Sequence, residues 1–260
     1  MTIYKIWLMG VGKLEKIAIL SDVHGNIPAL EAVLNDIRKR KVNRVICLGD
    51  IVGKGPCPDI AIDIIMEACD VIIRGNWEEG IISEFQCDNL KWHKDKIGKE
   101  RLDYLKNLPF SIDFFTSGRL IRLFHASPIN TFHRVQEWAP FNDRLAMFVN
   151  TKMTKEGSIC DLSPNVVGYG DVHHGFVQNF NGKTLFNVGS VGNPLDIPQA
   201  SYAILEGAYG SRQLNSFSIH LVRVPYNIDL AINEAKDSNM PQLDEYISEL
   251  RTARYRGLKK

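Results

Sequence analysis

Short runs of β-branched and aliphatic residues alternate with helical patterns in the first half of the sequence, and each run is closed by a polar turn that contains glycine. The runs are residues 17–20, 45–48 and 71–73, and apolar residues recur at helical spacing over 26–41 and 60–69. This alternation is typical of parallel strands joined by crossover helices. We therefore predict an α/β protein whose strand ends gather at one edge of a sheet.

The second half of the sequence has a different pattern, in which hairpins replace the crossover helices. Strands are predicted at residues 110–115, 120–124, 166–167, 176–180, 184–186, 202–205 and 217–224. Ser117-Gly118 and Asn181-Gly182 separate the members of two strand pairs, and such dipeptides favour the tight turns of antiparallel hairpins. One charged helix is predicted over about 230–254.

Composition excludes several classes of protein. A chain of 260 residues, 45% of them hydrophobic, can bury the core of one large domain. The formal net charge of +1 is unlike that of a general nucleic-acid binder, and the chain has no acidic tail. Its five cysteines are scattered, with no Cys-x-x-Cys pair, and are expected to be reduced thiols.

The chain is predicted to have three parts. Residues 1–16 contain only short apolar stretches, too few to cross a bilayer or to act as a signal peptide, and are assigned to an N-terminal extension. Residues 17–226 are predicted to form one domain with a helical cap insert at about 78–108, and 227–260 a C-terminal helix packed on the same domain. Reduced cysteines and the lack of an apolar span favour a cytoplasmic protein.

Side chains that can bind a metal ion follow five of the predicted strands. In chain order they are Asp22, His24, Asp50, Asn76, His125, Asp171 and His173. Carboxylate, imidazole and amide oxygen are ligands for manganese, iron or zinc rather than for calcium or a thiolate site. Each residue alone has another explanation, as a helix cap or a hydrogen-bonded core histidine. Seven of them in order at strand ends predict a shared metal centre.

The motifs that contain these residues resemble those of the calcineurin-like metallophosphoesterases, which are Asp-x-His, Gly-Asp, Gly-Asn-His-Asp/Glu, a strand-terminal His and Gly-His-x-His. The matching segments are Asp22-Val23-His24, Gly49-Asp50, Gly75-Asn76-Trp77-Glu78, His125 and Gly170-Asp171-Val172-His173, and the resemblance covers residues 17–194. Residues 187–194 are also similar to a segment of a small bacterial and archaeal branch. That branch includes phosphodiesterases and diadenosine tetraphosphate hydrolases.

The resemblance implies a fold, a ligand set and a mechanism. The fold would be a four-layer αββα sandwich of two mixed β-sheets flanked by helices. Asp22, His24 and His173 would hold one metal ion, Asn76, His125 and Asp171 the other, and Asp50 would bridge both. Asp50, Asn76 and His125 would form the catalytic set. The cofactors would be two divalent or trivalent ions, manganese and/or iron, with zinc, nickel or magnesium as alternatives, and a metal-bound hydroxide would attack phosphorus.

Two positions depart from the family pattern. Asp171 stands where the first histidine of Gly-His-x-His is usual, which adds an anionic ligand and favours harder cations such as manganese or ferric iron. Trp77 stands where phosphatases of this superfamily have a histidine that can protonate the leaving oxygen. Indole cannot act as that acid, so leaving groups of low pKa are expected. His93, His133 and His174 are candidate replacements for the acid, or else packing and surface residues.

Charged and aromatic side chains near the predicted centre have two interpretations. Lys54, Arg74, Arg134 and Lys94 either hold distal phosphates or are solvated surface charges, and surface charge is the ordinary case. Trp77 either stacks on a nucleobase or packs beneath the helical insert.

The predicted function is hydrolysis of a phosphodiester or of a nucleotide phosphoanhydride such as a dinucleoside polyphosphate. The partner would be a small-molecule phosphoester or nucleotide, without general nucleic-acid binding and without a membrane. Two alternatives are a Ser/Thr phosphoprotein phosphatase and a non-catalytic scaffold with the same fold, as in the retromer subunit of this superfamily.

Overall fold

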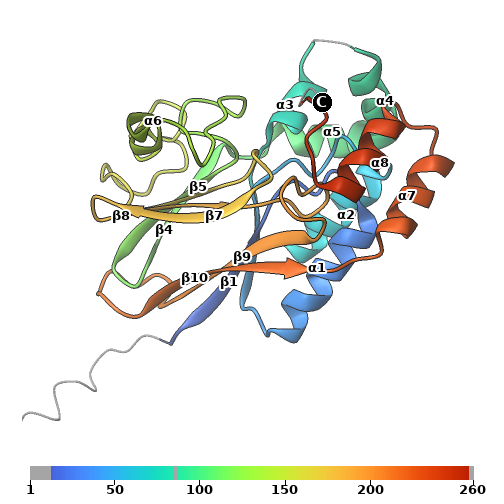
Figure 1. Cartoon of the computed structure of the whole chain (residues 1–260). Helices are drawn as coiled ribbons and strands as arrows, with labels where there is room; N and C mark the ends of the chain where they lie inside the picture. The colour runs from blue at the N-terminus through green and yellow to red at the C-terminus, as the bar shows by residue number, and fades with distance from the viewer. Residues whose placement is uncertain (1–12, 85–86, 258–260) are drawn as a thin grey trace, which may run out of the picture.

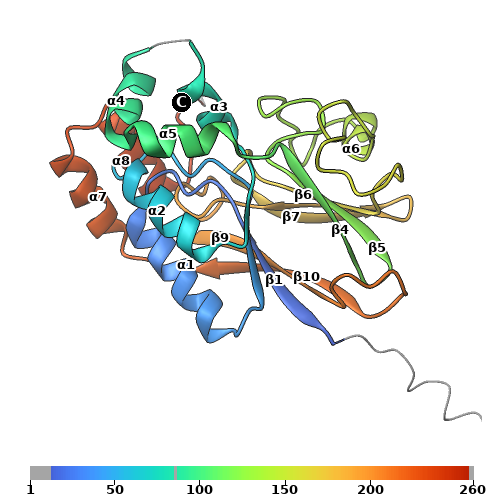
Figure 2. The same cartoon turned by 180° about the vertical axis from the view of Figure 1, so that it is seen from behind.

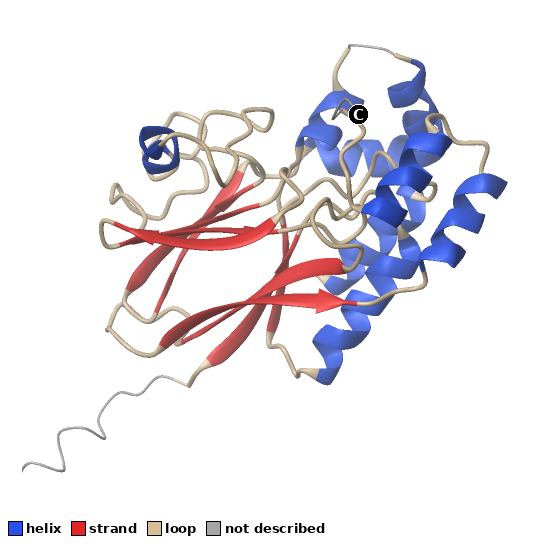
Figure 3. Cartoon of the chain, viewed as in Figure 1, coloured by secondary structure: helices blue, strands red, loops and turns tan. Residues whose placement is uncertain are grey.

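The computed structural model describes residues 13–84 and 87–257 and contains two five-stranded sheets (Figure 1, Figure 3). The strands are β1 (Glu15–Leu20), β2 (Arg44–Cys47), β3 (Val71–Ile72), β4 (Ser111–Thr116), β5 (Arg119–Phe124), β6 (Val166–Tyr169), β7 (Gly175–Phe180), β8 (Lys183–Val188), β9 (Ala200–Gly207) and β10 (Phe217–Val224). The helices are α1 (Ile27–Lys39), α2 (Pro58–Ala68), α3 (Asn76–Ile82), α4 (Asp88–Ile97), α5 (Lys99–Lys106), α6 (Phe141–Ala146), α7 (Ile228–Asp237) and α8 (Leu243–Thr252).

Both sheets are mixed, and in each the central strands run parallel. The first sheet has the order β10-β9-β1-β2-β3, with β1, β2 and β3 parallel and β9 antiparallel to β1. The second has the order β4-β5-β6-β8-β7, with β5, β6 and β8 parallel. The carboxyl ends of parallel strands lie at one edge of a sheet, so the loops after β1, β2, β3, β5 and β6 meet.

The two sheets pack face to face over an apolar core. Ile17 and Ile19 of β1 belong to the same buried cluster as Ile121 and Leu123 of β5. Ala18 and Leu20, which alternate with them along β1, pack instead in the cluster that includes the apolar faces of α1 and α2. This period of two is what a strand between two packed layers requires. Figure 2 shows α1 and α2 side by side over the first sheet.

The outer face of the second sheet is covered mainly by loop, together with the short helix α6. The ring of Phe180 on β7 contacts both Phe141 and Phe148 of this segment. Tyr169 on β6 donates a hydrogen bond to the backbone oxygen of Val135 at 2.6 Å. The predicted four-layer sandwich of two mixed sheets is thus confirmed, and its fourth layer contains little helix.

Local signals explain most element boundaries. Asn26 caps α1 by accepting a hydrogen bond from the backbone nitrogen of Ala29 at 3.2 Å. Asn181 and Gly182 have φ of 51° and 72° in the turn between β7 and β8, as the predicted hairpin requires. β1 begins at Glu15, two residues earlier than predicted, because that residue and the next pair with β9. Residues 1–12 of the predicted extension lie outside the described residues.

The prediction of one helix over 230–254 is wrong, because the chain forms two helices separated by residues 238–242. Asn239 and Gln242 have φ of 55° and 57°, which is left-handed backbone that a helix does not contain. Pro241 between them has no backbone N–H to donate to a preceding turn. Within residues 13–84 and 87–257, none of the helices combines the length and the apolar character needed to span a membrane.

Candidate metal centre

The backbone is left-handed at most of the strand ends that carry the predicted ligands. The φ angles are 56° at Asp22, 51° at His24, 51° at Asp50, 62° at Asp171 and 59° at His173. Residues other than glycine adopt such angles rarely, although aspartate and histidine do so more often than most. Backbone of this kind gathers at functional sites, where the surrounding structure holds it in place. Five of the seven predicted residues share this feature.

Three histidines are oriented by backbone carbonyl groups. The Nδ1 atoms of His24, His125 and His173 lie 2.9, 2.9 and 2.5 Å from the backbone oxygens of Val52, Leu48 and Asn193, respectively. A carbonyl can only accept, so each Nδ1 carries a proton, and in the neutral imidazole each Nε2 presents a lone pair. Histidines that bind metal ions typically donate their other ring N–H to a carbonyl or carboxylate in this way.

One group of possible ligands consists of Asp22, His24 and His173. Nε2 of His173 lies 3.2 Å from Nε2 of His24 and 3.2 Å from Oδ1 of Asp22. Among the described residues, Oδ1 of Asp22 is buried without a hydrogen-bond donor. An orphaned carboxylate oxygen facing two imidazole lone pairs is costly unless a cation lies among them. The donors therefore fit a metal ion.

The second group lies around Asp50. Its carboxylate is 3.4 Å from Nε2 of His125 and 3.8 Å from Nε2 of His24, so it lies between the two groups. The amide of Asn76 contacts Nε2 of His125 at 3.1 Å. In one orientation the amide oxygen of Asn76 faces Nε2 of His125 and the carboxylate of Asp50, and a cation would satisfy these three acceptors. In the other orientation the amide nitrogen donates to the Asp50 carboxylate at 2.8 and 3.1 Å.

Burial and close contact shift the pKa values in the cluster. Burial alone raises the pKa of Asp22, but the imidazoles of His173, His125 and His24 together outweigh it and the net pKa is lowered. Burial raises the pKa of Asp50, and burial together with His173 lowers that of His24. Burial also opposes charge on His125, yet the Asp50 carboxylate raises its pKa to about 10. A metal ion would therefore compete with a proton at His125.

Asp171 differs from the other predicted ligands because it is paired with an arginine. Its two oxygens accept hydrogen bonds from Nε and Nη2 of Arg134 at 2.9 and 2.8 Å. Its carboxylate approaches Nε2 of His125 only to 3.9 Å. Each carboxylate oxygen has a second lone pair, so the pairing does not prevent metal binding. The arginine balances the charge that an aspartate adds in place of imidazole, and the ligand role of Asp171 stays a prediction.

Glu78 is a positioning residue that the ligand pattern did not reveal. It is fully buried, and its carboxylate accepts from the backbone nitrogens of Asp50, Ile51, Val52 and Gly75 at 2.8, 2.8, 3.3 and 2.8 Å. Burial and the nearby Asp50 raise its pKa to about 7. These bonds tie the loop after β2 to the loop after β3, which places Asp50 beside Asn76.

Glu78→Gln is expected to lower the free energy of unfolding by about 2 kcal/mol, because an amide NH₂ would face two backbone donors that are left unpaired. Metal content after purification should fall as well, since the loop of Asp50 loses its anchor. Urea unfolding and metal analysis measure the two effects. Glu79→Gln is the control, because Glu79 is partly exposed beside Arg74. Equal losses in both variants would contradict the positioning role.

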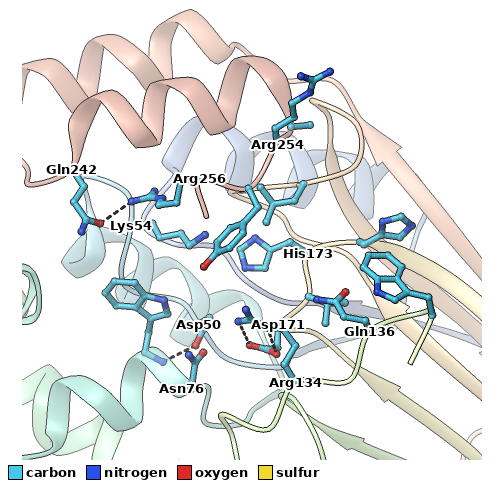
Figure 4. Close-up of a pocket in the computed structure, with 17 residues that line it drawn as sticks. Asp50, Lys54, Asn76, Arg134, Gln136, Asp171, His173, Gln242, Arg254 and Arg256 are labelled. Atoms are coloured by element: carbon cyan, nitrogen blue, oxygen red, sulfur yellow. Dashed lines mark hydrogen bonds and ion pairs between the residues drawn. The ribbon is translucent and has the colours of Figure 1, made fainter. Parts of the chain in front are cut away.

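A cavity of about 440 Å³ opens beside these residues (Figure 4). The predicted ligands at its wall are Asp50, Asn76, Asp171 and His173. Four basic side chains line it, namely Lys54, Arg134, Arg254 and Arg256. Three aromatic side chains line it, namely Trp77, Trp138 and Tyr255. Lys54 and Arg134 were candidates from the sequence, whereas residues 254–256 follow α8 and had no local signal to place them there.

The fold and the site define a metallophosphoesterase architecture. A metallophosphoesterase from Sphaerobacter thermophilus superposes with a TM-score of 0.69 and 25% identity, over 93% of this chain and all of its own. The hypothetical protein PH1004 from Pyrococcus horikoshii OT3 shares the fold with a TM-score of 0.71 and 22% identity, over 94% of this chain and 99% of its own.

The chain belongs to the calcineurin-like phosphoesterase superfamily, whose domain profile matches residues 16–208. The uncharacterized protein MJ0912 of Methanocaldococcus jannaschii is 30% identical over an alignment of 256 residues. The match covers 87% of this chain and 94% of that protein. The resemblance read from the motifs is thereby confirmed at the level of the family.

Proposed function

We propose that the protein is a metal-dependent hydrolase of phosphoanhydrides in nucleotides, with activated phosphodiesters as secondary substrates. One observation carries the proposal. A cluster of carboxylates and imidazole Nε2 atoms, with an orphaned oxygen on Asp22, opens into a cavity lined by basic and aromatic side chains. Lysine and arginine suit phosphate groups, and aromatic rings suit nucleobases.

Each part of the centre has a task in this reaction. Asp22, His24 and His173 would hold one metal ion, Asn76, His125 and Asp171 would hold the second, and Asp50 would be shared by both. Bound metal ions supply positive charge that stabilises phosphoryl oxygens and lowers the pKa of water toward neutrality. The buried walls around Asp22 and Asp50 keep bulk solvent away, which strengthens these electrostatic effects.

Protonation of the leaving group is the step for which this chain has the fewest suitable side chains. Trp77 occupies the position of the expected acid, and its ring packs edge-on against His93. His93 is fully buried, and its pKa is lowered to about 4 by burial and by Lys96. His174 lines the cavity but pairs with Glu137 at 3.2 Å. A missing acid costs about 10²- to 10⁴-fold on alkoxide leaving groups and little on phosphate leaving groups.

A comparison of substrates tests this proposal. With manganese added, kcat/KM for diadenosine tetraphosphate is expected to exceed that for a phosphoserine peptide by at least about 100-fold, in line with the value of a general acid. Bis(p-nitrophenyl) phosphate, with its low-pKa leaving group, serves as the positive control, and EDTA as the metal-free control. Faster cleavage of the peptide would favour a phosphoprotein phosphatase and would refute the argument from Trp77.

A different measurement distinguishes a non-catalytic scaffold from an enzyme. Fold alone does not establish activity, and a chain with this fold can serve for binding only. Metal analysis of the purified protein, together with the three substrates above, distinguishes the cases. Two bound metal ions without turnover of any substrate would favour the scaffold.

A further inference from the structure

Two basic side chains converge beside the candidate metal centre from distant parts of the sequence. Lys54 follows β2, and Arg256 belongs to the C-terminal arm, which we define as residues 253–257 after α8. Both contact Glu249 of α8, and both line the same cavity as Asp50 and His173. Figure 4 shows Lys54 and Arg256 on the same side of that cavity. The position of the arm is thus coupled to the position of Lys54.

Lys54 is held rigidly for a lysine. Its φ of 56° is left-handed, although lysine has none of the local hydrogen bonding that favours asparagine there. Its Nζ donates to Oδ1 of Asn193 at 2.7 Å and lies 3.6 Å from Oε2 of Glu249. The backbone oxygen of Asn193 in turn accepts from Nδ1 of His173. One residue therefore orients both Lys54 and a predicted metal ligand, which fixes the ammonium group near the metal centre.

Arg256 is also oriented and keeps free donors. Its Nε and Nη2 donate to Glu249 at 2.9 and 2.8 Å, and its Nη1 donates to Gln242 at 2.7 Å. A guanidinium group has five N–H donors, so these three bonds leave one on Nη1 and one on Nη2. Lys54 likewise keeps at least one of its three. Pre-oriented donors of this kind bind an anion without loss of side-chain freedom.

The charge balance of the group favours an anion. Lys54 and Arg256 carry two positive charges, and Glu249, which is fully buried behind them, carries one negative charge. The Lys54 ammonium also lies 6.0 Å from the centre of the Tyr255 ring, which places an aromatic face beside the same group. One net positive charge and an aromatic ring match a phosphate attached to a nucleoside.

We propose that Lys54 and Arg256 form a subsite for a second phosphate group, so that the C-terminal arm selects substrates with two or more linked phosphates over monophosphates. The inference rests on the proposed function for its substrate class. Its test is a binding measurement that needs no turnover, so the two can fail separately. Glu249 is a positioning residue in this scheme, because it touches both cations and not the cavity.

Calorimetry on the full-length, metal-loaded protein provides the test, with α,β-methylene-ADP and AMP as probes. The wild type is expected to bind the diphosphate analogue more tightly than AMP. Arg256→Gln should reduce that preference by about 10- to 100-fold, as the loss of hydrogen bonds to a charged group predicts. Lys54→Asn should act in the same direction, because asparagine tolerates left-handed backbone.

Arg251→Gln is the matched control, because Arg251 is exposed on α8 and its ion pair with Asp229 lies away from the cavity. It should leave the preference unchanged. If Arg256→Gln does not fold, Lys54→Asn decides the question. An unchanged preference in the folded variants, or no preference in the wild type, would overturn the subsite. A preference that depends on Arg256 in a protein without hydrolase activity would sustain the subsite and refute only the proposed reaction.

Discussion

Asp50→Asn is expected to lower kcat for bis(p-nitrophenyl) phosphate by at least about 100-fold, with the fold retained. The carboxylate lies between Nε2 of His24 and Nε2 of His125, at 3.8 and 3.4 Å. It therefore lies close to an imidazole nitrogen of each group of possible ligands, as a carboxylate shared by two cations would. A metal ion contributes several kcal/mol of charge stabilisation, and about 2.7 kcal/mol corresponds to 100-fold in rate.

The substitution is conservative in shape, so its effect reports charge. An asparagine oxygen can still accept the hydrogen bond that the backbone nitrogen of Trp77 donates to Oδ1 at 2.9 Å. Metal content should fall together with kcat, and circular dichroism should remain that of the wild type. Asp63→Asn is the control, since Asp63 forms an exposed pair with Arg101 on the surface. Full metal content with full activity in Asp50→Asn would rule out a shared ligand.

The sequence predicted the parts of the fold that depend on local patterns. Runs such as 17–20 and 45–48 are buried strands because their β-branched residues alternate between two packed layers. The turn at Asn181-Gly182 was predictable because few dipeptides adopt two consecutive positive φ angles. The break between α7 and α8 follows from Pro241, which the prediction of one charged helix over 230–254 did not take into account.

The candidate site was predictable as far as its residues directly follow predicted strands. All seven predicted residues lie within one connected cluster, which follows from parallel strands whose carboxyl ends meet. The partners of that cluster were not predictable in the same way. Arg134 reaches Asp171 and Glu249 reaches Lys54 across 37 and 195 residues of chain, and no periodicity links positions so far apart.

Asp171 illustrates how a departure from a motif is accommodated by the rest of the structure. Its φ of 62° is close to the 56° of Asp22, so the two Asp-x-His turns share a backbone conformation that aspartate tolerates. The extra negative charge is met by the bidentate contact with Arg134, which lies in the loop after β5. The aspartate at position 171 and the arginine that balances its charge lie in different loops. The sequence therefore revealed the departure from the motif but not its partner.

Asp113→Asn is expected to cause the largest loss of stability, about 3 to 5 kcal/mol, which corresponds to a decrease of about 6 to 20 °C in Tm. Asp113 on β4 and Arg122 on β5 are directly opposite in the hairpin, and both side chains are fully buried. Two hydrogen bonds of 2.8 Å join them. Loss of the carboxylate charge would leave the Arg122 guanidinium buried without a counter-ion, which is the costly case for a buried pair.

Thermal and urea unfolding of three variants distinguishes the cost of an unpaired buried charge from the contribution of the Asp113–Arg122 pair to stability. The double variant Asp113→Leu with Arg122→Met should lose less stability than Asp113→Asn, because it leaves no buried charge. Asp229→Asn, in an exposed pair with Arg251, should lose at most about 1 kcal/mol. Arg122 also donates to Asn150 at 2.9 Å, and so anchors the segment that follows α6. A double variant that is as unstable as Asp113→Asn would contradict the assignment of that loss to the unpaired charge.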